Sequence, residues 1–212
     1  MNAAIDALIA ALAAAPVASD ACNEYAPNSE TNAIRRANLR LYLQAMAARQ
    51  PDTLLLMEAP GYRGCRLTGV PVTSRKILLE GVPELNLFGV QQGYARTEDS
   101  GFESVYGEQS ATIVWGTLAR LQAMPLIWNT YPFHPMRPGA PLSNRAPRRD
   151  EIAQGLGLLE QVLALYRPAR LLAVGNVAAG AFTSLGLPHQ KIRHPAQGGK
   201  ADFVAGLTRA LA

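Results

Sequence analysis

Apolar residues recur along the chain in two different patterns, and these predict the elements of the fold. In the longer segments apolar side chains fall at helical spacing, starting with the alanine-rich N-terminal stretch. Three shorter runs are almost continuously apolar and are bounded by proline, glycine or polar residues, a pattern typical of buried strands. Helices are predicted within residues 1–22, at 31–50, 74–81, 110–122 and 150–166, from near Val177 and from Ala201, and strands at 52–57, 124–129 and 170–175.

The order of these elements predicts the fold class. Strands alternate with helices as βαβαβα, which indicates an α/β protein with three α/β/α layers and a mainly parallel central sheet. The 212 residues are predicted to form a single domain, 1–212, with an N-terminal helical extension at about 1–50. Residues 83–107 are irregular and rich in glycine and acidic residues, and they form either a long functional loop or an excursion with strands of its own.

Composition and charge narrow the classes of protein. Hydrophobic residues make up 49% and charged residues 17% of the chain, and the formal net charge of +4 suits an anionic partner as well as an ordinary soluble protein. No apolar run reaches the roughly 18 residues of a membrane-spanning helix, and no Lys or Arg precedes Arg35, which argues against a secretion signal. Cys22 and Cys65 are too few for a disulfide framework, so both are expected as free thiols in a cytoplasmic monomer.

A carboxylate stands where the first predicted strand ends. Glu58 follows the strand directly and precedes a proline that stiffens the turn and a glycine that lets the backbone approach a ligand. Because ligands bind at the carboxyl ends of parallel strands, Glu58, Asn129 and Gly175 are predicted to lie at one edge of the sheet. Glu58 can serve there as a base, an electrostatic stabiliser or a holder of water; alternatively, it caps a helix or pairs with Arg63 or Arg66.

Two further loops carry candidate chemistry. Asn129 ends the second predicted strand, and its amide either reads the edge of a nucleobase or a peptide-like group, or simply anchors the loop. His194 precedes a glycine-rich turn whose backbone N–H groups can face a phosphate, although a single histidine in a loop is usually a surface residue. His134, His189 and His194 are not interleaved with cysteines or acidic residues at metal-ligand spacing, so no metal site is predicted.

Together these loops resemble the uracil-DNA glycosylase superfamily, and their layout is most similar to the bacterial and archaeal family-four enzymes. The resemblance covers about residues 53–203. It is carried, in chain order, by the segments MEAPG, TGVP, WNT, NRAPRRDEI, YRPARLLAVGNVAAGAF and RHPAQGG. The order and approximate spacing of these segments support the resemblance more than any one of them does.

The resemblance implies an enzyme that removes a damaged base from DNA. Enzymes of this superfamily flip a base, typically uracil, out of the DNA and hydrolyse its N-glycosidic bond without a metal or redox cofactor. Because positive charge develops on the sugar and negative charge on the base, such a site holds a water below C1′ and a donor against the base oxygen. The motif matches imply that Glu58 faces the sugar and its water, that Asn129 binds the base edge, and that His194 donates to the departing base.

The chain departs from the family pattern around the base. Ala59 stands where uracil-specific enzymes have a water-activating aspartate, as an alanine also does in family four, so either Glu58 or Asn129 is expected to activate the water. Gly61 replaces a thymine-excluding tyrosine, and Val72 replaces an aromatic residue that stacks on the base, a role that Tyr62 or Phe133 can take from another loop. The expected substrate-binding residues are Ala59, Pro60, Gly61, Tyr62, Val72 and Phe133.

Other departures concern the cofactor and the DNA contacts. The four cysteines of family four are absent, so no iron–sulfur cluster and no other cofactor is expected. Ala196 replaces a phosphate-binding serine, and Gln197 with the following glycines replaces a leucine-type wedge. A positive rim on the strand-end face is expected to hold DNA phosphates, although for each cation alone a solvated surface is the simpler interpretation. The expected DNA-binding residues are Arg145, Arg148, Arg149, Arg193, Gln197, Gly198 and Lys200.

Three classes of function stay open, in order of preference. The first is a DNA glycosylase, because Glu58, Asn129 and His194 all stand in the matching loops. The second is a non-catalytic protein of the same fold that binds DNA or a nucleobase, since similarity of fold does not establish function. A nucleotide-binding enzyme of the Rossmann type is disfavoured, because the glycine-rich strand-to-helix turn AVGNVAAGAF comes late and lacks an acidic partner at the expected spacing.

Overall fold

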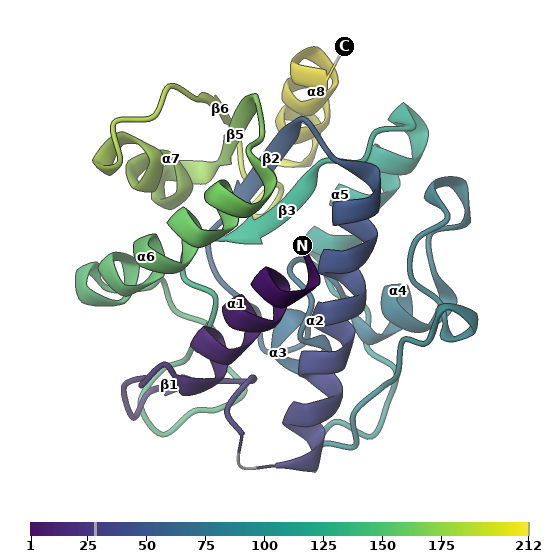
Figure 1. Ribbon diagram of the computed structural model, residues 1–212, viewed down its shortest axis with the longest axis vertical. Coiled ribbons are helices and arrows are strands. Elements are labelled where there is room, and N and C mark those ends of the chain that lie inside the picture. Colours follow the sequence, from purple (N-terminus) through teal and green to yellow (C-terminus); the bar gives the residue numbers. More distant parts are fainter. Residues whose placement is uncertain (28, 212) are drawn as a thin grey trace.

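Four parallel strands form the central sheet of the computed structural model, which describes residues 1–27 and 29–211 (Figure 1). The strands are β2 (Thr53–Met57), β3 (Leu126–Asn129), β5 (Arg170–Val174) and β6 (Gln190–Ile192), and they lie in the order β3-β2-β5-β6. Every residue of β2 and β3 is buried, because the surrounding helices cover the sheet. The predicted α/β fold, with a parallel sheet between helical layers, is confirmed.

Most helices begin and end close to their predicted positions. They are α1 (Asn2–Ala14), α2 (Glu30–Arg49), α4 (Arg75–Glu80), α5 (Gln109–Leu121), α6 (Arg149–Tyr166), α7 (Gly175–Ser184) and α8 (Lys200–Leu211), with one further turn, α3 (Cys65–Thr68).

Three short strands and one helix start differ from the prediction. β6 lies in a segment that was expected to be a loop, and the antiparallel pair of β1 (Ala21–Cys22) and β4 (His134–Pro135) was not predicted at all. Runs of two or three residues are too short to show a periodic pattern. α7 begins at Gly175 and not near Val177, because the φ of 88° at Gly175 lets the chain turn directly from β5 into the helix.

The two N-terminal helices, predicted as an extension, share the hydrophobic core with the sheet. Ile5 and Leu12 of α1 are fully buried, and α1 packs against both α2 and α6. The Tyr42 hydroxyl of α2 accepts a hydrogen bond from the backbone N–H of Ile127 at 2.8 Å and donates to its carbonyl at 3.2 Å. Tyr42 therefore satisfies backbone groups of the edge strand β3. No helix in the described ranges is long and apolar enough to span a membrane.

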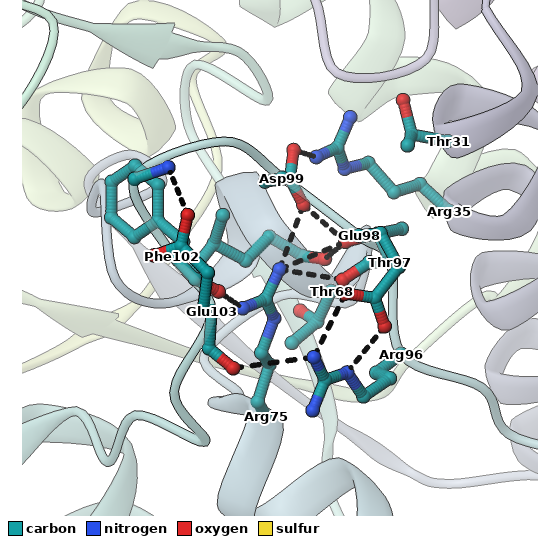
Figure 2. Close-up of polar contacts among 12 residues, drawn as sticks. Thr31, Arg35, Thr68, Arg75, Arg96, Thr97, Glu98, Asp99, Phe102 and Glu103 are labelled. Atoms are coloured by element: carbon teal, nitrogen blue, oxygen red, sulfur yellow. Dashed lines mark hydrogen bonds and ion pairs between the residues drawn. The ribbon is translucent and has the colours of Figure 1, made fainter.

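A buried ion-pair network fixes the long segment between α4 and α5 (Figure 2). Residues 83–107, all of which the structure describes, contain no strand and only two short 3-10 turns, η1 (Pro83–Leu85) and η2 (Val90–Gln92). The Asp99 carboxylate pairs with Arg35 of α2 and, at 2.8 Å, with Arg75 of α4. Arg75 is completely buried, and its guanidinium also donates to the Thr97 carbonyl at 2.6 Å. One carboxylate thus joins the segment to two helices.

Loss of the Asp99 carboxylate is expected to destabilise the protein strongly. In Asp99→Asn, two buried guanidinium groups lose their counter-ion, and breaking a buried pair in this way typically costs about 3–5 kcal/mol. Glu98→Gln is the matched control, because that exposed carboxylate pairs with the neighbouring Arg96 and is expected to contribute less than about 1 kcal/mol. Urea denaturation of both variants measures the difference. Equal losses of unfolding free energy would contradict the structural role given to Asp99.

Candidate functional site

A cleft of about 920 Å³ opens at the carboxyl ends of β2, β3 and β5. Its wall includes Glu58 after β2, Asn129 at the end of β3 and Gly175 after β5, the three positions that the sequence placed at one edge of the sheet. His194 joins them from the loop between β6 and α8. The structure therefore brings together three side chains that stand in three separate loops of the sequence.

Parallel pairing continues past the ends of β2 and β3 and holds Glu58 next to Asn129. Met57 is the register partner of Asn129. Beyond this pair, the N–H of Thr130 donates to the Met57 carbonyl at 2.8 Å, and the N–H of Tyr131 donates to the Glu58 carbonyl at 3.0 Å. The segments after β2 and β3 separate only beyond these hydrogen bonds. The backbone therefore fixes the positions of the Glu58 and Asn129 Cα atoms relative to each other.

The Glu58 side chain is half-buried in the cleft wall without a cation beside it. Arg63 and Arg66, the partners that the sequence suggested, form no ion pair with it in the described residues, and its carboxylate caps no helix there. Burial raises the pKa of Glu58 above its usual value. A carboxylate of this kind is available to accept a proton or a hydrogen bond from a water in the cleft.

Asn129 is buried in the wall of the cleft, and among the described residues its amide oxygen is a hydrogen-bond acceptor without a partner. The side chain is 2% exposed, and its Nδ2 lies 4.0 Å from the Cys65 Sγ, a weak contact that orients the amide. Within the described residues its Oδ1 has no hydrogen-bond partner, although buried polar atoms are almost always paired. The arrangement leaves Oδ1 free to accept a hydrogen bond from a ligand that enters the cleft.

His194 is held in one tautomer by its own loop. The N–H of Ala196 donates to the Nδ1 of His194 at 3.1 Å, so in the neutral ring the proton sits on Nε2. Burial lowers the pKa of His194; the nearby Glu108 raises this pKa and Arg193 lowers it. The imidazole is therefore neutral near pH 7 and presents an Nε2–H donor.

Two glycines shape the backbone around His194. An ideal Cβ placed on Gly175 would lie 3.6 Å from the His194 Cβ, so His194 packs directly against the first turn of α7. A Cβ on Gly199 would lie 2.1 Å from the His194 carbonyl oxygen, a distance that no side chain tolerates. Glycine at 199 is thus required for the tight turn that carries His194 into the cleft.

Behind the cleft wall lies a buried polar cluster that the sequence did not reveal. Glu24 is fully buried; its carboxylate accepts from the backbone N–H of His134 at 3.3 Å and lies 3.9 Å from the Cys65 thiol. The Nδ1–H of His134 donates to the Pro60 carbonyl at 2.9 Å. Burial raises the pKa of Glu24 to about 8. The cluster supports Pro60 and Cys65, two residues of the cleft wall.

Two aromatic residues that were expected to contact the nucleobase do not reach the cleft wall. Phe133 is 0% exposed and packs edge-on against Tyr25 and Tyr131 in the core, so its expected contact with the substrate is wrong. Phe133 lies four residues after Asn129, the last residue of β3, and at this point the loop directs its side chain into the core. Tyr62 is half-buried against Phe102 and does not line the cleft. Of the expected substrate-binding residues, those in the cleft wall are Ala59, Pro60, Gly61 and Val72.

The expected positive rim is also smaller than predicted. Arg145 lines the cleft, but its guanidinium donates to the carboxylates of Glu151 at 2.6 Å and Asp20 at 3.1 Å. Arg148 pairs with Asp20 as well. Two acids thus neutralise two arginines, which serve the fold, and their expected role in binding phosphate is not supported.

The other expected DNA-binding residues remain exposed. Arg193 and Gln197 line the cleft, whereas Gly198 lies beside it in the loop. Arg149 is the first residue of α6 and Lys200 the first of α8.

Several polar residues of the cleft wall were missed by the sequence analysis. Glu108 is the N-cap of α5, where its carboxylate accepts from the N–H groups of Ser110 at 3.0 Å and Ala111 at 2.6 Å. An acidic residue before a helix indicates a cap, but nothing in the local pattern indicates that this helix start faces the cleft. The other missed polar residues of the wall are Thr73, Gln109, Ser110, Asn144, Asn176 and Lys191.

Comparisons with known proteins leave the family open, since no family model and no curated protein matches this chain. Within the described part of the chain, no three side chains among His, Cys, Asp and Glu converge as metal ligands do. The geometry of the cleft is therefore the main guide to function.

Glu24 predicts a specific dependence of stability on pH. The unfolded chain releases the Glu24 proton near pH 4.5, whereas the folded protein keeps it to about pH 8. Between these values the folded state binds the extra proton, so the contribution of Glu24 to the free energy of unfolding falls as pH rises. Glu24→Gln is expected to remove this fall. Urea denaturation of wild type and variant at pH 5 and pH 8 measures this fall in unfolding free energy. If wild type and variant differ in stability by the same amount at both pH values, Glu24 is not a buried neutral acid.

Proposed function

We propose that this protein is a DNA glycosylase that flips uracil or another deaminated base into the cleft and hydrolyses its N-glycosidic bond. The observation that carries the proposal is the convergence of three unlike groups in one cleft: the half-buried Glu58 carboxylate, the unpaired Asn129 amide oxygen and the neutral His194 N–H. An N-glycosidic hydrolase needs a group of each kind. The resemblance of the surrounding loops to the uracil-DNA glycosylase superfamily supports the same activity.

Asn129 supplies the recognition of the base. Its Oδ1 accepts from a ring N–H and its Nδ2 donates to the adjacent ring carbonyl, so the amide is complementary to the N–H/C=O edge of uracil. Hypoxanthine and xanthine carry the same edge, whereas cytosine and adenine present an amino group beside an unprotonated nitrogen. The contact of Nδ2 with Cys65 favours the orientation that selects the deaminated bases. Gly61 offers no side chain that would exclude a methyl group, so thymine is a further candidate.

Glu58 and His194 supply the chemistry. As the bond between C1′ and the base nitrogen breaks, its electron pair moves onto the base, and the His194 Nε2–H donates a hydrogen bond to the base oxygen that becomes negative. The Glu58 carboxylate stabilises the positive charge on the sugar and accepts a proton from the water that adds to C1′. The base leaves as an anion that takes a proton from solvent, and Glu58 returns its proton to solvent. The products are a free base and an abasic site in the DNA.

A non-catalytic protein that binds DNA or a nucleobase is the second candidate. One observation favours it over the enzyme: Val72 provides no ring to stack on the base and hold it for turnover. The neutralisation of Arg145 and Arg148 by acids counts against DNA as the ligand of either candidate, and so favours a free nucleobase as the ligand of a binding protein. Such a protein would keep the base-reading Asn129 without turnover.

A strand-cleavage assay separates the two candidates. Wild type is incubated with labelled oligonucleotides that carry uracil, hypoxanthine or xanthine, single-stranded or paired, and abasic sites are revealed with alkali. Glu58→Gln is expected to lower the rate about 10²- to 10⁴-fold, as for loss of a general base. His194→Ala is expected to lower it about 10²- to 10³-fold, as for loss of an oxyanion donor, whereas His194→Gln keeps an N–H and retains more activity.

The exposed Glu98→Gln serves as the matched control for Glu58→Gln and is expected to cleave at the wild-type rate. Folding of each variant is checked by circular dichroism. Absence of abasic sites on every deaminated base, with DNA binding intact, would overturn the enzyme and leave the binding protein.

A further inference from the structure

Two arginines and three aromatic rings gather beside the cleft where the loop after β2 meets the segment before α5. We call this group the arginine–aromatic cluster; its members are Tyr62, Arg63, Arg66, Phe102 and Tyr106. The Arg63 guanidinium carbon lies 5.3 Å from the Tyr62 ring centroid and 5.2 Å from that of Tyr106. The Arg66 guanidinium carbon lies 5.2 Å from the Phe102 ring centroid. Each cation is therefore within cation–π range of a ring.

In contrast to Arg145 and Arg148, the arginines of the cluster form no ion pair within the described residues. Among the described residues, Arg63 is exposed and takes part in no ion pair or hydrogen bond. Within the same residues, the Nε and Nη1 atoms of Arg66 are buried and have no hydrogen-bond partner. Buried donors without acceptors are costly, so a ligand that brings acceptor oxygens would be favoured here.

The cluster is fixed and continuous with the cleft. Gly61 and Gly64, which flank Tyr62 and Arg63, line the cleft, as does Glu108 two residues after Tyr106. The ion-pair network of Figure 2 holds the opposite side, because Arg75 donates to the Phe102 carbonyl and, at 3.3 Å, to that of Ser104. A strand whose target nucleotide enters the cleft would place a neighbouring nucleotide at the cluster.

We propose that the arginine–aromatic cluster binds an unpaired nucleotide next to the target base, so that the protein prefers single-stranded DNA. This inference rests on the proposed function of the cleft. An unpaired base can stack on the exposed guanidinium plane of Arg63, which is backed by two phenol rings. The guanidinium N–H groups then donate hydrogen bonds to the phosphate. In a duplex the flanking bases are already stacked and paired, so only the phosphate would be available to the cluster.

Binding to DNA without any lesion tests the cluster. Fluorescence anisotropy with one labelled sequence, single-stranded or annealed to its complement, is measured at fixed salt for wild type, Arg63→Ala, Tyr106→Ala and Arg63→Lys. Loss of a stacked base typically weakens affinity about 5- to 150-fold, which corresponds to about 1–3 kcal/mol. That loss is expected for all three variants on the single strand, with duplex affinity changed less than about threefold. Arg63→Lys keeps the charge but not the planar surface.

Controls separate this inference from the proposed function. Arg209→Ala removes an exposed arginine near the carboxyl end of α8, outside the cleft wall, and is expected to bind both DNAs as wild type does. Equal losses on single strand and duplex, or full rescue by Arg63→Lys, would overturn the stacking platform in favour of a simple phosphate contact. The DNA in this experiment carries no lesion, so the result does not depend on whether the protein cleaves damaged DNA in the strand-cleavage assay. If every variant binds single-stranded DNA as wild type does, the role proposed for the cluster is wrong, even if the protein is an active glycosylase.

Discussion

The parallel pairing of β2 with β3 on one side and β5 on the other determines where the cleft forms and which residues line it. Since all three strands run in one direction, their carboxyl ends meet at one edge, and the residues that follow them form a common cleft. The two hydrogen bonds made beyond the ends of β2 and β3 carry this alignment into the loops. Tyr42 covers backbone groups on the free side of β3, so the sheet and the cleft rely on the same N-terminal helices.

Paired and unpaired polar groups divide the cleft region into scaffold and site. Arg145, Arg148 and Asp99 each meet opposite charges, and these contacts fix loops and helix starts. The Asn129 Oδ1 and the Arg66 Nε, in contrast, are buried without partners among the described residues. Both atoms lie in the cleft wall or in the arginine–aromatic cluster, where a ligand would supply the missing partner. These unpaired groups are the evidence for ligand binding, and the many arginines of the sequence contribute less to it than their number suggests.

The sequence predicted those features that depend on neighbours close along the chain. Continuous apolar runs located β2, β3 and β5, and the rule for parallel sheets then placed Glu58 and Asn129 at the same edge. Features that depend on distant partners were not predictable. Arg145 appeared to be a phosphate ligand in part because one of its two partners, Asp20, lies 125 positions earlier in the chain; the other, Glu151, is close in sequence, but the pattern does not show that it turns toward Arg145.

The same limit applied to the interior. Nothing in the pattern around Glu24 distinguishes a fully buried acid from a surface one, because the residues that bury it come from later loops. Phe133 was expected at the base since it follows a strand end, but loop conformation, which composition does not specify, directs it into the core.

We propose that the cleft adds water across an N-glycosidic bond. A single-turnover reaction on a uracil-containing strand in water enriched in ¹⁸O, with both products analysed by mass spectrometry, tests it most directly. We expect free uracil without label and an abasic strand that carries one ¹⁸O at C1′, after the strand has been reduced with borohydride at once to prevent exchange. Recovery of an intact, unlabelled strand from a protein that binds it would show that the cleft does not hydrolyse the bond and is a site for recognition alone.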